Sequence, residues 1–157
     1  MLLTDAWKKI SELESKAAWL YGFYAEIFAN IPDVCKLFKD LREEELIHYD
    51  QASFYRRLVE RNQKRFSGIT VELDGIDALI AEIDIHVRDG VFDVIDALNF
   101  SMYLEECAAE DQIRTVASKT DPELEKLSGL MGTGDSRHLE KVRAFRDLWI
   151  RNALPDA

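Results

Sequence analysis

Apolar residues recur along most of the chain at every third or fourth position, which is the spacing of one face of an α-helix. The periodic stretches are long, and the sequence contains few glycines and prolines. The pattern therefore predicts an all-α fold, with long helices over about residues 4–29, 32–66, 92–118 and 122–152. Thr4 or Asp5 is expected to cap the first helix, and Pro32 to begin the second. A short extra helix is expected in the 67–92 connection, over about residues 74–87.

Each of the four long helices carries an acidic residue in the middle of its apolar face. In the second and fourth helices a histidine follows the acid three residues later. Residues three apart share one face of a helix, so both side chains of each pair point to the same side. A buried carboxylate without a partner is unfavourable, so these faces must meet something that balances the charge. The six residues are Glu14, Glu45, His48, Glu105, Asp135 and His138.

The second half of the chain repeats the first. When residues 32–62 are moved forward by 90 positions onto 122–152, they align without a gap, and His48 falls on His138. Glu45 falls on Asp135. A shift of 91 positions places the first helix on the third, so that Glu14 falls on Glu105. The chain is therefore interpreted as a single domain, residues 1–157, in which two helix pairs, about 4–66 and 92–152, form one four-helix bundle.

The six residues predict a pair of metal ions in the middle of this bundle. An inward acid from each of two helices, with an acid-x-x-His from each of the other two, is the ligand pattern of di-iron and di-manganese carboxylate bundles. Four carboxylates carry four negative charges, which two divalent cations would balance. Oxygen-rich ligation with one imidazole per ion suits iron or manganese better than structural zinc. At any one position the alternative is a solvated carboxylate or one paired with a lysine.

The sequence also resembles a known family, the rubrerythrin branch of the ferritin-like superfamily. The resemblance covers nearly the whole chain, and its motif is a helix-borne Glu, a Tyr seven residues later and a Glu-x-x-His on the next helix. It implies a ferritin-like fold with two iron ions, or a mixed pair with manganese or zinc, that reacts with hydrogen peroxide or dioxygen. The residues that carry the resemblance are Glu14, Tyr21, Glu45, His48, Glu105 and His138.

The resemblance also implies roles for individual residues. Three glutamates, Glu14, Glu45 and Glu105, would be catalytic. Of these, Glu45 and Glu105 would bridge the ions, Glu14 and Asp135 would be terminal ligands, and one histidine would bind each ion. Tyr21 would donate a hydrogen bond that orients a carboxylate. Gln112 takes the equivalent position in the second half of the chain.

The sequence departs from the family in its second half. Asp135 stands where the family has Glu, and glycines at 129, 132 and 134 precede it. The chain has no rubredoxin domain, so electrons would come from a separate donor protein. Leu46 replaces the haem-ligating methionine of bacterioferritins, so no haem is expected. A second hypothesis is therefore a non-catalytic helical bundle with a weak or partly lost metal site, acting as a sensor or an assembly partner.

Composition and charge narrow the function classes further. The net charge of -10 and a pI near 4.8 argue against binding to nucleic acid or to an anionic membrane. Cys35 and Cys107 form no Cys-x-x-Cys motif, which argues against a rubredoxin-type iron centre. Neither an apolar leader nor an 18-residue apolar segment is evident, so a cytoplasmic location is expected. Trp19 and Phe23 fall off the inner stripe, which predicts a homodimer formed through helices.

Overall fold

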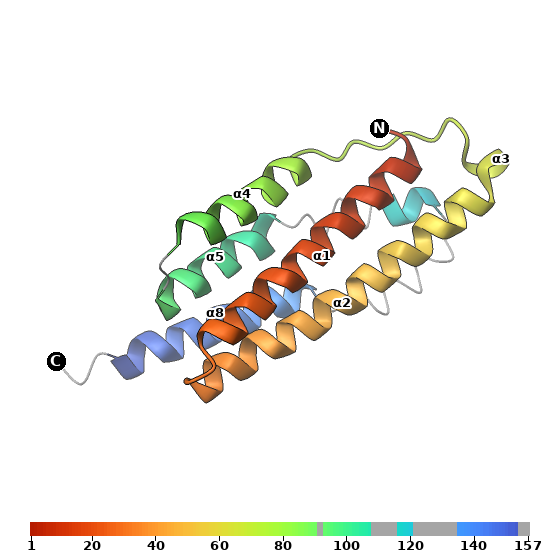
Figure 1. Cartoon of the computed structure of the whole chain (residues 1–157). Coiled ribbons are helices and arrows are strands. Elements are labelled where there is room, and N and C mark those ends of the chain that lie inside the picture. Colours follow the sequence, from red (N-terminus) through yellow and green to blue (C-terminus); the bar gives the residue numbers. More distant parts are fainter. Residues whose placement is uncertain (91–92, 108–115, 121–134, 154–157) are drawn as a thin grey trace.

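The computed structural model describes residues 1–90, 93–107, 116–120 and 135–153, and the side chains of 135–137 are not part of this description. Most of the described residues are helical and none lies in a β-strand, which confirms the predicted all-α class (Figure 1). The ferritin-like arrangement of a four-helix bundle stays a prediction. The helices are α1 (Leu3–Ile27), α2 (Pro32–Arg61), α3 (Gln63–Phe66), α4 (Ile76–Asp89), α5 (Val94–Cys107) and α8 (Asp135–Ala153).

Two helix pairs organise the chain. A short turn joins α1 to α2, and the two helices run antiparallel along most of their length, whereas α5 packs against α8 and α4 packs against α1 (Figure 1). Large side chains that are almost fully buried, Trp7, Tyr21 and Phe38 among them, fill the space between these helices. No helix within the described ranges is long and apolar enough to cross a membrane.

The first helix starts earlier than predicted. It begins at Leu3 and has no side-chain cap, so the expectation that Thr4 or Asp5 caps it is wrong. Leu2 is extended and pairs with Thr70 in an isolated antiparallel bridge, and the amino group of Met1 donates to the Val71 carbonyl at 2.9 Å. The connection after α3 therefore fixes the start of α1. Asp5 lies in the first turn, where its charge favours the helix dipole.

The second predicted helix is interrupted at Asn62. Pro32 begins α2 as expected, but the helix ends at Arg61 and a separate short helix, α3, follows. The Asn62 side chain donates to the Leu58 carbonyl at 2.8 Å, while the Asn62 backbone N–H bonds to Val59 instead. An asparagine side chain that takes a helical carbonyl competes with the backbone and ends the helix. The expected helix in the following connection is present as α4, which Gly75 precedes with a positive φ of 81°.

His86 on α4 has no candidate partner nearby in the sequence, but its side chain contacts two other helices. Its ring is half-buried and stacks on Phe100 of α5, with 3.8 Å between ring centroids and an interplanar angle of 4°. The hydroxyl oxygen of Tyr24, on α1, lies 2.6 Å from His86 Nε2. Burial, with the nearby charge of Asp96, raises the pKa of Tyr24 well above its usual range, so the hydroxyl keeps its proton and shares a hydrogen bond with the imidazole. The contact joins α1, α4 and α5.

This environment makes stability depend on pH. Burial lowers the pKa of His86 although Asp96 opposes the shift, so the unfolded chain takes up the proton first as the pH falls below about 6.5. We expect the His86 contribution to the free energy of unfolding to fall between pH 7 and pH 5. A His86→Gln variant, which keeps an acceptor but does not titrate, should lose less stability over this range in urea unfolding. If both proteins lost the same unfolding free energy between pH 7 and pH 5, a lowered pKa of His86 would be contradicted.

Candidate metal centre

Glutamates and histidines from four helices meet inside the bundle. Five of the six predicted ligands come together, from α1, α2, α5 and α8, and all of them have largely buried side chains. The sixth, Asp135, begins α8, but its side chain lies outside the described part of the chain, as does Gln112. The five converging residues are Glu14, Glu45, His48, Glu105 and His138.

Glu45 stands between the two histidines. One of its oxygens, Oε2, lies 3.4 Å from His48 Nδ1, and the other, Oε1, lies 3.2 Å from His138 Nδ1. The two imidazole rings are stacked with their centroids 5.2 Å apart. A carboxylate that presents one oxygen to each of two imidazoles has the arrangement needed to bridge two ions.

The other two glutamates each lie near a different histidine. Glu14 Oε2 lies 3.8 Å from His48 Nδ1, and Glu105 Oε2 lies 3.6 Å from His138 Nδ1. The second oxygen of Glu105 accepts a hydrogen bond from the Tyr21 hydroxyl. Glu14 and His48 therefore form one half of the cluster, and Glu105 and His138 form the other.

Glu44, which the sequence pattern does not single out, contacts His138 at the ring nitrogen opposite to the one that faces Glu45. Glu44 Oε2 lies 2.5 Å from His138 Nε2, and its other oxygen accepts a hydrogen bond from Lys141 Nζ at 2.9 Å. With Nε2 bonded to Glu44, the other ring nitrogen of His138, Nδ1, faces Glu45 and Glu105. Such carboxylate partners orient the histidines of metal sites. Glu44 is one of three consecutive glutamates, and nothing in that run distinguishes it, because its partner comes from a helix about 90 residues away.

The buried acids and His138 shift one another's pKa values. Burial by itself would raise the pKa of Glu45, but its contacts with His138, His48 and Glu14 lower it to about 2. Burial by itself would lower the pKa of His138, but Glu105 and Glu45 raise it to about 10. Burial raises the pKa of Glu105, and the charge of Glu45 adds to the rise. The metal-free centre thus contains an ionised Glu45 beside a protonated imidazole, and a cation that binds there must displace that proton.

These groups fit a divalent cation. One ligand atom each from Glu45, His48 and His138 lie within 4.8 Å of one another. His138 Nδ1 is fully buried, and it forms no hydrogen bond within the part of the chain that the structure describes. Two ligands about 2.1 Å from one ion and at right angles to each other are about 3 Å apart, close to the nitrogen–oxygen separations seen here. A cation between the oxygens and Nδ1 would satisfy the unpartnered atom.

Comparison of the chain with protein-family models, with curated proteins and with solved structures found no match.

The contact between Glu44 and His138 Nε2 should contribute to metal affinity. We expect Glu44→Gln to weaken metal binding by about 10- to 100-fold, as removal of such orienting partners does in other metal sites. Competition with a chelator of known affinity measures the change. Glu43→Gln, an exposed neighbour on the same helix, is the matched control and should bind metal like the wild type. An unchanged affinity in Glu44→Gln would show that the contact does not orient the ligand.

Proposed function

We propose that the chain binds two divalent metal ions, iron in the active form, and uses them to reduce hydrogen peroxide or to oxidise ferrous iron. The observation that carries the proposal is Glu45, whose two oxygens face the two histidines at 3.4 and 3.2 Å. One buried residue that faces two imidazoles supports a centre with two ions rather than one.

The contacts favour a division of the ligands between the two ions. Glu14 and His48 would bind one ion, Glu105 and His138 the other, and Glu45 would bridge them. The family resemblance implies that Glu105 also bridges. Its second oxygen, however, accepts a hydrogen bond from Tyr21, which favours a terminal position for Glu105. Asp135 remains a proposed terminal ligand on the strength of its position in the repeat.

The residues around the ligands would hold the centre in shape. Burial, together with the charges of Glu105 and Glu45, raises the pKa of Tyr21 well above its usual range, so its hydroxyl stays protonated and keeps donating to Glu105. Glu44, itself held by Lys141, would keep the proton of His138 on Nε2. Bound redox-active ions would supply electrons for cleavage of an O–O bond, and a separate protein would have to replace those electrons.

A second candidate function is a helical bundle that does not turn over substrate and serves as a sensor or an assembly partner. It is favoured by the partners that these charges find within the protein, since His138 contacts both Glu45 and Glu44, and Lys141 also pairs with Glu44. Buried ion pairs of this kind can persist without metal when each charge has a partner. In that case the cluster would fix how the helices pack.

Peroxide consumption by the iron-loaded protein separates the two candidates. Protein loaded with Fe(II) under anaerobic conditions is mixed with hydrogen peroxide, and peroxide loss is compared in the wild type, Glu45→Gln and Glu43→Gln. The proposal predicts loss of peroxide with the wild type and with Glu43→Gln, but not with Glu45→Gln. Full consumption by Glu45→Gln would exclude the cluster as the reactive site. Metal binding without consumption by any of the proteins would favour the non-catalytic bundle.

A further inference from the structure

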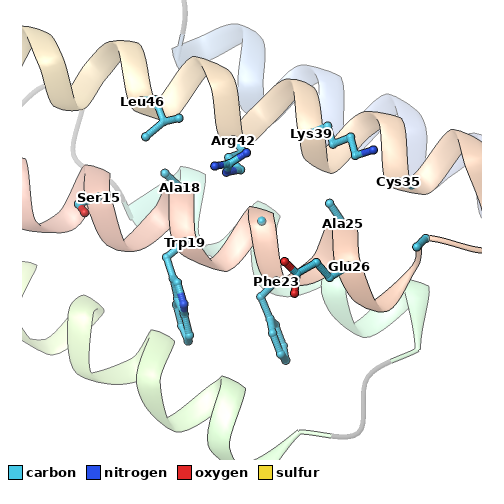
Figure 2. A pocket seen from close by; sticks show the side chains of 12 residues that line it. Ser15, Ala18, Trp19, Phe23, Ala25, Glu26, Cys35, Lys39, Arg42 and Leu46 are labelled. Atoms are coloured by element: carbon cyan, nitrogen blue, oxygen red, sulfur yellow. The ribbon is translucent and has the colours of Figure 1, made fainter.

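A groove of about 630 Å³ runs along α1 and α2, and none of the five described metal ligands lines it (Figure 2). Small residues of α1, Ala18, Gly22 and Ala25, form its floor. Trp19 and Phe23 point to one side of α1 and form one edge, and side chains of α2 form the other edge (Figure 2). Trp19 is 46% exposed, although it is among the largest apolar side chains of the protein.

The close approach of Arg42 to Gly22 shows which residues of α1 and α2 face each other across the groove. A Cβ atom added at Gly22 would lie 3.2 Å from Cδ and 3.3 Å from Nε of Arg42, so the glycine provides the space in which the arginine crosses α1. Because α1 and α2 are antiparallel, residues that precede Gly22 are level with residues that follow Arg42. Trp19 is therefore level with Leu46, and Glu26 is level with Lys39, as Figure 2 also shows.

The two edges complement each other in chemistry. At one level an exposed tryptophan lies across the groove from an exposed leucine, and at another a glutamate lies across from a lysine. A twofold axis parallel to α1, above the small residues, would bring the first edge of one copy against the second edge of another. Trp19 would then pack on Leu46 of the second copy, and Glu26 would pair with its Lys39. Interfaces of this kind are isologous, so every such contact is made twice.

The floor and the charge of the groove support the same occupant. Ala18 and Ala25 are small, which allows two helices to approach closely, so the α1 helices of two copies could pack on either side of the arginine that crosses Gly22. The chain has a net charge of -10, which opposes association of two copies over most of its surface. The groove, however, is lined by two cations, Lys39 and Arg42, and one acid, Glu26. The groove therefore lacks the strong negative charge of the chain as a whole, and Glu26 of each copy can pair with Lys39 of the other.

We propose that this groove is a self-association surface, through which two copies of the chain pair about a twofold axis parallel to α1. The large exposed aromatic at its edge is of the type that anchors protein interfaces. The proposal concerns the outer surface and does not depend on metal binding, so it can fail while the metal centre stands.

Charge reversal across the groove tests the pairing. Sedimentation and light scattering of the wild-type chain should give about twice the 18.1 kDa mass of one chain. Glu26→Lys and Lys39→Glu should each weaken dimerisation about tenfold or more, because each places like charges together. The double variant should restore it, and Lys64→Glu, an equal change on exposed α3, should have no effect. A monomeric wild type, or single variants that dimerise normally, would overturn the proposal.

A disulfide tests the direction of the axis. Ser15 is exposed and continues the line of small residues on α1, so the arrangement places the two Ser15 positions opposite each other. With both native cysteines replaced by serine, Ser15→Cys should form a covalent dimer on mild oxidation. Ala78→Cys, on the exposed side of α4, should not. A dimer that never crosslinks through Ser15→Cys would contradict the parallel arrangement even if the mass is doubled.

Discussion

Addition of Fe(II) or Mn(II) under anaerobic conditions is expected to raise the thermal midpoint of the metal-free protein by about 5–10 °C. A ligand that binds only the native state stabilises it by about 2.7 kcal/mol when present at about 100 times its dissociation constant. For a domain of this length, 1 kcal/mol corresponds to roughly 2–4 °C. The metal must displace the proton that Glu105 and Glu45 hold on His138, so all midpoints are compared at one fixed pH.

The matched control for this melt is Glu45→Gln, which keeps the size of the side chain but removes its negative charge. Its midpoint should not respond to metal, because the group that faces both histidines can no longer bridge. A midpoint that rises equally in both proteins would show that the metal binds elsewhere. The absence of a shift in the wild type would favour the non-catalytic bundle.

The replacement Trp7→Ala is expected to lower the free energy of unfolding by about 3–5 kcal/mol, the range for removal of a large aromatic from a core. Trp7 is only 1% exposed, and its ring stacks on Tyr55 of α2 with centroids 4.5 Å apart. Its Nε1–H also donates to Thr120 Oγ1 at 2.9 Å, so it joins α1 and α2 to residues 116–120. Urea unfolding at constant pH measures the loss.

A second variant separates the packing of Trp7 from its hydrogen bond. Thr120→Val keeps the shape of residue 120 but leaves the buried indole N–H without its acceptor, which should lower the stability by about 1–3 kcal/mol. If Trp7→Ala destabilises the protein by no more than Thr120→Val does, then the ring is not a central packing element.

The helices could be predicted from the sequence because their apolar residues recur with helical spacing over long stretches. The inward-facing acids could be predicted for the same reason, since Glu14 and Glu45 interrupt stripes that are otherwise apolar. The exact ends of the helices could not. The start of α1 depends on a bridge between Leu2 and Thr70, and the end of α2 depends on one asparagine side chain that bonds to Leu58.

Two residues escaped prediction because their partners lie far away in the chain. Glu44 occupies a position on α2 that looks solvent-facing, and only the packing of α8 brings His138 and Lys141 to it. His86 has no partner nearby in the sequence, and its contacts come from Tyr24 on α1 and Phe100 on α5. Periodicity shows which side of a helix is buried, but it does not show which helix covers that side.

The most direct test of the metal centre is the number of ions each chain retains. Wild-type, Glu45→Gln and Glu43→Gln proteins are loaded with Fe(II) under anaerobic conditions, desalted and analysed for iron. A centre bridged by Glu45 predicts two ions per chain in the wild type and in Glu43→Gln, and loss of both from Glu45→Gln. Retention of the same amount of iron by Glu45→Gln as by the wild type, or of none by any of the three, would contradict it.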